Sequence, residues 1–484
     1  MQSPVLDSEP TRTSPPPSRT AFAAKIALVV VLVAELMNTL DGSVVYTAIP
    51  SIQASTGAGA AAVQWLSAGY ALTFALGLIT GGRLGDAYGR KRVFLTGTAV
   101  FTLASLLCGV ADGPGLLIGA RVLQGAAAAV MIPQVLATLH VTFDGENRSK
   151  AFGLYGAVMS VGTVAGPVLG GLVTEADILG LGWRPIFLVN APIGIAAIIL
   201  GKIFITESRA EQAERLDVAG MLLSALAMVL IIFPLTEGHT HNWPTWCFAM
   251  LIAGFAVLAV FLRHQSRKKE APLVVLSLFR GRQFSGGLAT QLMLGLLSGV
   301  FFLTWTIYLQ RGLGLSPLHA ALAFVVISLG EMAGAGIAMK TVSRSGRRVP
   351  QTGALLALAS MAFYGHQVTF QQGGLTIAVM ALPVLLLGIG FGMIGAPIAD
   401  MSLAKVAHRH AGSASGLFNT STQLGIALGT ALTGMVFFSA TGGSLDGAVN
   451  RTAFASSLWY VGGAFAVMWA LMFLLPKHTT TPKG

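Results

Sequence analysis

The stretch GRLGDAYGRKR at residues 82–92 places five charged residues between two long apolar segments of the chain. Only 10% of all residues are charged, so this concentration is unusual. A charged junction between two membrane helices lies at a membrane face, because hydrocarbon makes each charge costly. Gly82 and Gly89 allow two helix ends to approach closely, and Asp86 can cap a helix or pair with a neighbouring arginine. The stretch therefore predicts a tight hairpin between two membrane-crossing helices.

The composition extends this interpretation to the whole chain. The 484 residues are 54% hydrophobic and their mean hydropathy is +0.74, values typical of a protein that crosses the membrane many times. Apolar runs of about 20 residues are long enough to span a bilayer as helices. They predict an all-α polytopic membrane protein of 14 transmembrane helices, at residues 26–48, 63–82, 93–111, 116–139, 151–174, 185–204, 217–237, 245–262, 284–310, 318–340, 351–368, 375–403, 412–438 and 454–475.

The positive charges indicate how these helices are oriented. With the N-terminus inside, the cytoplasmic segments hold 26 of the 30 Lys and Arg residues. The opposite side keeps Arg184, Arg311 and Arg451, and Arg121 falls inside a helix. Such a bias sets membrane orientation, so both termini are expected in the cytoplasm of a plasma-membrane protein. The net charge of +11 then reflects topology rather than a nucleic-acid surface.

The ends of the chain and its two cysteines carry little further signal. Residues 1–25 are rich in Pro and Ser and predict a disordered cytoplasmic tail, and residues 476–484 a second one. Cys108 and Cys247 lie far apart inside apolar runs. They are expected to be small packing residues rather than a disulfide framework.

The second half of the chain echoes the first. KAFGLY at 150–155 aligns with SASGLF at 413–418, an offset of 263 residues that also superimposes three pairs of glycines. The charged hairpin has a counterpart in SRSGRR at 343–348. Parallel repeats of this kind predict two pseudo-symmetric six-helix bundles. Their expected ranges are 26–204 and 283–475, with residues 205–282 forming an inserted helix pair and an amphipathic linker on the cytoplasmic surface.

Four motifs in chain order resemble those of the major facilitator superfamily, and within it the fourteen-helix drug:proton antiporters. They are LDGSVVYTAIP at 40–50, the hairpin at 82–92, RVLQG at 121–125 and GTVAGPVLGG at 162–171. The resemblance covers nearly the whole chain. It implies alternating-access export of antibiotics or lipophilic drugs, driven by the proton gradient without a cofactor.

Asp41 and Arg121 are the first candidates for the chemistry. Asp41 lies about 24 Å along the first helix from Lys25, and Arg121 stands about five residues past the outer end of a helix that runs inward. At matching depth in one bundle the two side chains can pair. The resemblance implies that they couple transport to protons, and the alternative is a purely structural ion pair that fixes helix packing.

Two glutamates near the midplane are further candidates. Glu35 and Glu331 both lie about 15 Å from the inner face, where transporters of this architecture place their cargo site. With Asn38 and Asp41, Glu35 forms a polar stripe along the first helix. Desolvation favours the protonated form of an unpaired carboxyl, so each could exchange a proton for a cationic or zwitterionic cargo. The alternative for each is a protonated, hydrogen-bonded packing residue.

The other two motifs predict moving or closely packed parts. Gly162, Gly166 and Gly170 share one helix face, followed by Gly171, and Pro167 can bend this helix. The resemblance places the helix at the seam between the bundles. The hairpin residues Gly82, Asp86, Gly89, Arg90 and Arg92 are expected to gate, with Asp86 holding helix ends of the second bundle in one of the two states.

Other classes of function find little support. No phosphate-binding Gly-x-x-x-x-Gly-Lys-Ser/Thr loop, zinc-ligand spacing or nucleophile–base pair is visible, so ATP-driven transport, a metal site and a membrane-embedded enzyme are not expected. A metabolite importer or facilitator and a non-transporting sensor remain as alternatives. The expected partners are a small-molecule drug, protons and the lipid bilayer, and a monomer is expected.

Overall fold

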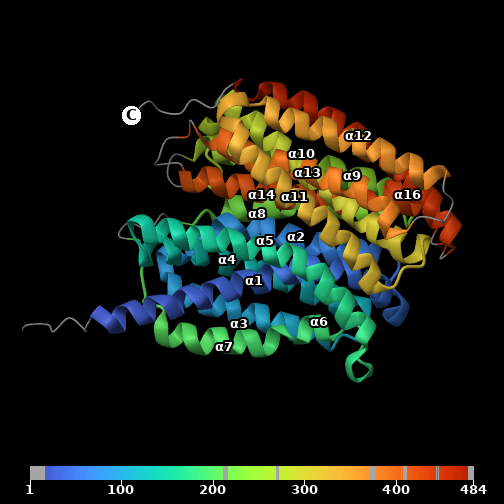
Figure 1. The fold of residues 1–484 in the computed structure, drawn as a ribbon. Helices are drawn as coiled ribbons and strands as arrows, with labels where there is room; N and C mark the ends of the chain where they lie inside the picture. Colours follow the sequence, from blue (N-terminus) through green and yellow to red (C-terminus); the bar gives the residue numbers. More distant parts are fainter. Residues whose placement is uncertain are drawn as a thin grey trace, which may run out of the picture.

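The computed structural model is helical throughout the part of the chain that it describes (Figure 1). That part comprises residues 17–210, 216–268, 272–370, 376–404, 406, 411–442, 444 and 446–477. The first bundle contains α1 Pro17–Thr56, α2 Ala60–Tyr88, α3 Arg90–Gly109, α4 Pro114–Thr142, α5 Gly145–Ala176, η1 Ile178–Gly180, α6 Pro185–Leu188 and α7 Asn190–Phe204. The inserted pair is α8 Val218–Glu237 and α9 Thr245–Arg267, followed by η2 Leu276–Arg280. The second bundle contains α10 Arg282–Ile307, η3 Tyr308–Gly312, α11 Pro317–Ser345, α12 Arg348–Phe370, α13 Ile377–Leu403, α14 Ala411–Thr433, η5 Gly434–Phe438, α15 Ser439–Thr441, α16 Gly447–Leu471 and η6 Met472–Leu474.

Thirteen of the described helical segments are long and apolar enough to cross a membrane. The predicted helix at 351–368 corresponds to α12, which is not among the thirteen. α12 has 23 residues, enough to span about 34 Å, but Gln351, His366 and Gln367 lower its hydropathy. Fourteen spans therefore fit the structure, with α12 as the least apolar of them.

The first helix begins earlier than the sequence predicted. α1 starts at Pro17, so residues 17–25 belong to a helix rather than to the predicted disordered tail. Proline is well suited to the first turn of a helix, and the alanines that follow favour helix formation. Residues 1–16 lie outside the described part of the chain, as do residues 478–484 of the predicted C-terminal tail.

Each bundle is built from helices that pack in the same pairs. In the first bundle α1 packs on α5 and α2 on α4, and in the second α10 packs on α14 and α11 on α13. Glycines bring these helices into backbone contact: a Cβ added at Gly125 would lie 2.3 Å from Tyr70 O, and one added at Gly299 would lie 2.4 Å from Ile426 O. Such spacing is possible only where the side chain is a hydrogen.

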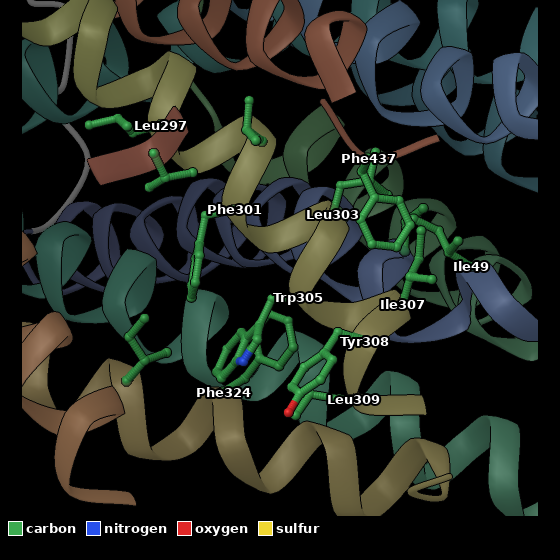
Figure 2. Close-up of a cluster of buried hydrophobic side chains, with 14 of the residues drawn as sticks. Ile49, Leu297, Phe301, Leu303, Trp305, Ile307, Tyr308, Leu309, Phe324 and Phe437 are labelled. Carbon is green, nitrogen blue, oxygen red and sulfur yellow. The ribbon is translucent and has the colours of Figure 1, made fainter. Parts of the chain in front are cut away.

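The core of the second bundle is aromatic (Figure 2). Trp305 stacks on Phe301 at 5.1 Å between ring centroids, and Tyr308 stacks on Phe454 at 4.3 Å. Trp305 Nε1 donates to the Tyr364 hydroxyl at 2.9 Å. Large rings bury much apolar area, so this cluster binds α10, α12 and α16 together.

The two bundles meet along α5 and α11 at only one end of these helices. We call the end that carries the 82–92 hairpin the hairpin side, and the other end the opposite side. At the opposite side, Glu175 accepts the Leu318 amide at 3.1 Å and a Cβ at Gly171 would lie 2.6 Å from Pro317 O. Towards the hairpin side, residues 152–161 of α5 are exposed around most of the helix. Along this seam the bundles are therefore closed at the opposite side and apart at the hairpin side.

The inserted pair covers the other seam, between α2 and α14. Ile232 of α8 packs with Ala71 of α2 and Ala427 of α14, and Trp65 Nε1 donates to Glu237 Oε1 at 3.0 Å. The two seams therefore differ, because the α2–α14 seam is covered by α8, on which α9 packs.

A buried carboxylate ties the hairpin-side ends of α8 and α9 together. Asp217 caps α8 through the Gly220 amide at 3.0 Å and also binds His264, Gln265 and Lys268 at 2.8–2.9 Å. Burial raises the pKa of Asp217, but hydrogen bonds from Lys268, His264, Gln265 and Gly220 outweigh burial and hold the pKa below its usual range. This acid therefore stays ionised at neutral pH.

The segment predicted to be an amphipathic linker on the cytoplasmic surface follows α9. Its described part is extended and then forms the short 3₁₀ turn η2, with Leu273 buried, and residues 269–271 lie outside the described chain. Val274 N donates to Gln265 Oε1 at 3.1 Å, and Arg83 donates to Pro272 O at 2.6 Å. Backbone groups of the linker thus bond to both α9 and the hairpin.

Candidate transport site

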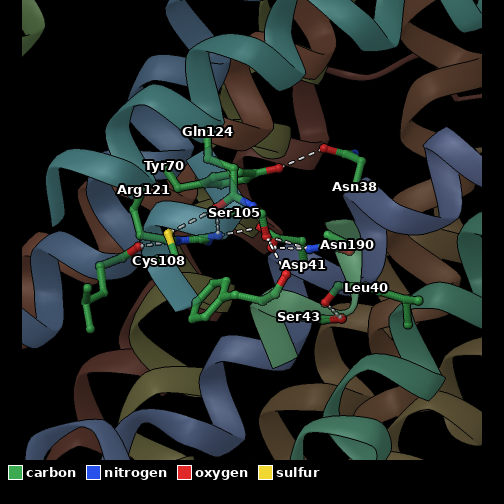
Figure 3. A network of polar contacts seen from close by, with 12 residues as sticks. Asn38, Leu40, Asp41, Ser43, Tyr70, Ser105, Cys108, Arg121, Gln124 and Asn190 are labelled. Atoms are coloured by element: carbon green, nitrogen blue, oxygen red, sulfur yellow. Dashed lines mark hydrogen bonds and ion pairs between the residues drawn. The ribbon is translucent and has the colours of Figure 1, made fainter. Parts of the chain in front are cut away.

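A buried ion pair lies inside the first bundle. Asp41 of α1 and Arg121 of α4 are each only 1% exposed, and Arg121 Nη1 donates to Asp41 Oδ2 (Figure 3). The two residues are 80 positions apart in sequence. The structure brings them together as their matching depths predicted. A pair so deep in apolar surroundings needs further hydrogen bonds to offset the loss of hydration.

Two amide side chains supply those bonds. Gln124 Nε2 and Asn190 Nδ2 donate to Asp41 Oδ1 at 2.8 and 3.2 Å. Arg121 Nη1 also donates to Gln124 Oε1 at 2.8 Å, and its Nε donates to Leu66 O at 3.2 Å. Gln124 and Asn190 were not predicted from the sequence. The signal was available for Gln124, a polar residue one helical turn after Arg121 within the quoted RVLQG motif.

A second layer holds these amides in place. Asn190 Nδ2 donates to Ser105 Oγ at 2.9 Å, and Ser105 Oγ donates to Phe187 O at 2.9 Å. Cys108, expected only to pack, is buried with its Sγ 3.8 Å from Gln124 Oε1. The network thus draws on α1, α3, α4 and α7, so its geometry depends on how four helices sit together.

The polar stripe of α1 continues away from the ion pair. Glu35 is 1% exposed, its Oε1 accepts from Thr39 Oγ1 at 3.2 Å, and its Oε2 has no hydrogen-bond partner within the described chain. The Tyr155 hydroxyl of α5 faces this carboxyl. Asn38 accepts a hydrogen bond from the Tyr70 hydroxyl at 2.7 Å. An unsatisfied buried oxygen is costly, so Glu35 is suited to take up a proton or a cation.

Glu331 is not brought to this network. It lies on α11 in the second bundle, and its main chain packs against Gly388 and Gly392 of α13. Its side chain is partly exposed and has no hydrogen-bond partner among the residues that the structure describes. Asp400 is exposed near the end of α13. The two candidate glutamates therefore belong to different bundles.

The predicted hairpin is a sharp turn at Gly89, whose φ of +104° favours glycine. Asp86 Oδ1 pairs with Arg90 Nη2 of the same hairpin at 2.8 Å, and no bond from Asp86 to the second bundle is present among the described residues. Gly82 is not at a tight contact, since a Cβ there would lie 3.8 Å from Pro133 Cβ. The close approach comes instead from Gly85, where a Cβ would lie 1.8 Å from Gln134 Oε1.

Glu207, which the sequence analysis did not identify, holds the hairpin from the segment after α7. Its carboxylate accepts the amides of Lys91 and Arg92 at 3.0 and 3.3 Å, and it lies 3.7 Å from Arg92 Nε. An acid at a helix N-terminus is favourable because the first amides of the helix have no partner within it. The hairpin is thus fastened to its own bundle.

The glycine face of α5 lies inside the first bundle and not at the seam. A Cβ at Gly162, Gly166 or Gly170 would collide with α1, at 2.9 Å from Thr39 Cβ, 1.9 Å from Ser43 Oγ and 2.4 Å from Thr47 Oγ1. Thr47 Oγ1 also donates to the carbonyl oxygen of Pro167, the residue expected to bend α5, at 3.2 Å. Only Gly171, one residue further round the helix, meets α11 across the seam. The motif therefore joins α5 to the helix that carries the acids.

Other kinds of site find no support in the described residues. Within them no group of three or more His, Cys, Asp or Glu side chains is placed to hold a metal ion. A pocket of about 720 Å³ lies between the start of α10 and the segment 473–477 that follows α16. Arg282, Arg347 and Lys477 are among its lining residues, and no residue of the ion-pair network lines it.

Comparison with known proteins identifies the family. Residues 31–430 match the Major Facilitator Superfamily. The chain belongs to this superfamily. It is a multi-pass membrane protein of a family of transporters.

Several curated relatives carry names that refer to antibiotics. The probable actinorhodin transporter of Streptomyces coelicolor is 38% identical over 447 residues, covering 92% of this chain and 77% of the relative. The tetracenomycin C resistance and export protein of Streptomyces glaucescens is 33% identical, covering 86% and 76%. The puromycin resistance protein of Streptomyces alboniger is 36% identical, covering 86% and 82%.

Solved structures match the superfamily fold at low sequence identity. A bacterial homologue of the human lysosomal transporter Spinster, in an inward-facing and occupied conformation, gives a TM-score of 0.67 at 16% identity. The alignment covers 95% of this chain and 97% of that one. At this identity the likeness concerns the fold alone.

Proposed function

We propose that this superfamily member is a proton-coupled exporter of small molecules, most of them antibiotics or lipophilic drugs. The observation that carries the proposal is the buried ion pair of Asp41 and Arg121, because a single proton can neutralise Asp41 and leave Arg121 without its anionic partner. The names of the curated relatives support export of antibiotics.

In the proposed cycle the hairpin side faces the cytoplasm, as the distribution of basic residues predicts, and both termini lie there. Cargo enters between the bundles from the hairpin side while Asp41 is ionised and paired with Arg121. A proton from outside neutralises Asp41, weakens the pair and favours the conformation that releases cargo. Glu35 and Glu331 give a cationic or zwitterionic cargo a carboxylate in each bundle.

The gradient is sufficient for this work. A proton moving down 100 mV releases about 2.3 kcal/mol, and each pH unit adds about 1.4 kcal/mol. A tenfold concentration ratio corresponds to about 1.4 kcal/mol, so each pH unit sustains about a tenfold gradient of cargo per proton. Exchange of one proton for a monovalent cation moves no net charge, so only a neutral or zwitterionic cargo also gains the electrical energy.

The test is transport of ethidium and of a neutral antibiotic into proteoliposomes, with and without an imposed pH gradient. We expect uptake to require the gradient and Asp41→Asn to abolish it. Glu331→Gln should lower ethidium transport about tenfold while the neutral compound is less affected. Uptake that persists undiminished without a gradient would contradict proton coupling, and accumulation in the reverse direction would indicate an importer.

A further inference from the structure

Tyr70 is the residue through which the ion pair and the Glu35 region touch. Its ring lies under the Arg121 guanidinium, with Arg121 Cζ 4.2 Å from the ring centroid. Its hydroxyl donates to Asn38 Oδ1 at 2.7 Å, one turn of α1 from Glu35 and from Asp41 (Figure 3). A single side chain of α2 thus contacts both candidate groups.

The helices on either side of this contact form two tight pairs. α2 is fastened to α4 by Thr73 Oγ1, which donates to Val122 O at 2.9 Å, and by the close approach of Gly125 to Tyr70 O. α1 is fastened to α5 by the glycines of the α5 motif and by the Thr47–Pro167 bond. Arg121 and Tyr70 therefore belong to one pair of helices, and Asp41, Asn38 and Glu35 belong to the other.

We propose that Tyr70 is a positioning residue that couples proton uptake at Asp41 to cation binding at Glu35 and Asn38. When Asp41 is protonated, Arg121 loses its anionic partner but keeps the π face of Tyr70 and the Leu66 carbonyl. The guanidinium then attracts the Tyr70 ring more strongly. The ring moves with it, and the hydrogen bond from the Tyr70 hydroxyl to Asn38 is lengthened or broken. Cargo bound at Asn38 and Glu35 changes the same hydrogen bond of the Tyr70 hydroxyl. By linkage, the factor by which cargo changes the proton affinity of Asp41 equals the factor by which protonation of Asp41 changes the cargo affinity.

The groups that face this junction come from five helices. They are Glu35 and Asp41 on α1, Tyr70 on α2, Cys108 on α3, Arg121 on α4 and Tyr155 on α5. Asp41 and Glu35 are the carboxyls of this set. Within this junction we therefore assign any dependence of cation binding on pH to these two acids, and Tyr70 decides whether they act together.

The inference rests on the proposed function, and the experiment separates the two. Binding of radiolabelled tetraphenylphosphonium is measured on the purified full-length protein in lipid nanodiscs at pH 6 and pH 8.5. For the unchanged protein we expect binding to weaken about tenfold at pH 6. Tyr70→Phe keeps the ring and removes the hydroxyl. The ratio of the Kd at pH 6 to the Kd at pH 8.5 should then fall to about threefold or less, while the Kd at pH 8.5 itself changes less than about twofold.

Two further variants keep the test decisive. Asn38→Ala removes the acceptor, so it should reduce the ratio as much as Tyr70→Phe, and the double variant should add nothing. Tyr364→Phe removes a buried hydroxyl from the second bundle and should leave the ratio unchanged.

Results that contradict the role of Tyr70 differ from results that contradict proton coupling. A Tyr70→Phe protein with the full tenfold ratio, or with affinity lowered equally at both pH values, overturns the role of Tyr70. A tenfold ratio missing from the unchanged protein overturns proton coupling itself, and the inference falls with it.

Discussion

The two bundles pack corresponding helices around very different centres. In the first, α1, α3, α4 and α7 meet at Asp41, Ser105, Arg121 and Asn190, joined by hydrogen bonds. In the second, α10, α12, α13 and α16 meet at Trp305, Tyr364, Met380 and Phe454, joined mainly by ring contacts. At the repeat offset of 263 residues, Asp41 falls on Thr304, which bonds only to its own helix.

This difference assigns separate tasks to the two centres. A charged network changes its energy when one proton is added, whereas an aromatic cluster has no charge to lose at physiological pH. The first centre can therefore report the proton gradient, and the second holds its bundle in one shape. Glu331, the acid of the second bundle, lies on α11 outside the aromatic centre.

The largest effect is expected when one partner of the ion pair in the first centre is removed and the other charge stays buried without it. Arg121→Leu leaves Asp41 buried and unpaired, and should lower the free energy of unfolding by about 3–5 kcal/mol. The double variant Asp41→Asn with Arg121→Leu should recover most of this loss, because no charge remains to be hydrated. Thermal unfolding in detergent measures both. A single variant as stable as the unchanged protein would mean that Asp41 is not ionised in the folded state.

A smaller effect is expected in the aromatic centre. Tyr364→Phe removes the acceptor of Trp305 Nε1 and should lower the free energy of unfolding by about 1–3 kcal/mol. Transport per folded molecule should stay unchanged, since this centre does not titrate. The measurement is ethidium uptake normalised to the amount of folded protein. If uptake by the variant no longer depended on the pH gradient, the aromatic centre would also take part in proton coupling.

The smallest effect is expected at Gly166 of α5, which we compare with Gly425 of α14 in the other bundle. A Cβ at Gly425 would lie 2.3 Å from Leu292 O and 3.0 Å from Gly295 Cα, so α14 must move away from α10. Gly425→Ala should cost about 1–3 kcal/mol. At Gly166 the nearest atom is the Ser43 hydroxyl, which can rotate, so Gly166→Ala should cost less than about 1 kcal/mol.

Adding Ser43→Ala should relieve the Gly166 variant and leave the Gly425 variant unaffected. Midpoints of thermal unfolding of the four proteins give the comparison. Equal losses at the two glycines would show that α1 and α5 are held as rigidly as α10 and α14.

The sequence was most informative where hydropathy decides the structure. Apolar runs predicted where the long helices lie, and similar depth in the membrane predicted that Asp41 and Arg121 can pair. The early start of α1 was missed because Ser18, Arg19, Thr20 and Lys25 keep residues 17–25 from forming an apolar run, although Pro17 and the alanines favour a helix.

The details of the two centres could not be predicted in the same way. Whether Gln124 or Asn190 points at Asp41 depends on how each helix is rotated, which apolar length does not determine. The aromatic centre was invisible because Trp305 and Phe454 read simply as apolar positions. The helix α5 does lie at the seam, as the resemblance implied, but its glycine face packs on α1, because a glycine spacing predicts a close contact without identifying the neighbouring helix.

The separation of 80 residues between Asp41 and Arg121 has a consequence for biosynthesis. At roughly 5–20 residues per second, α1 leaves the ribosome about 4–16 s before the arginine that will neutralise it. During that interval an acid near the middle of an inserting helix costs about 2.5–3.5 kcal/mol at the translocon. The first helix of this chain must therefore wait in the protein channel, or enter lipid with its carboxyls protonated, until the fourth arrives.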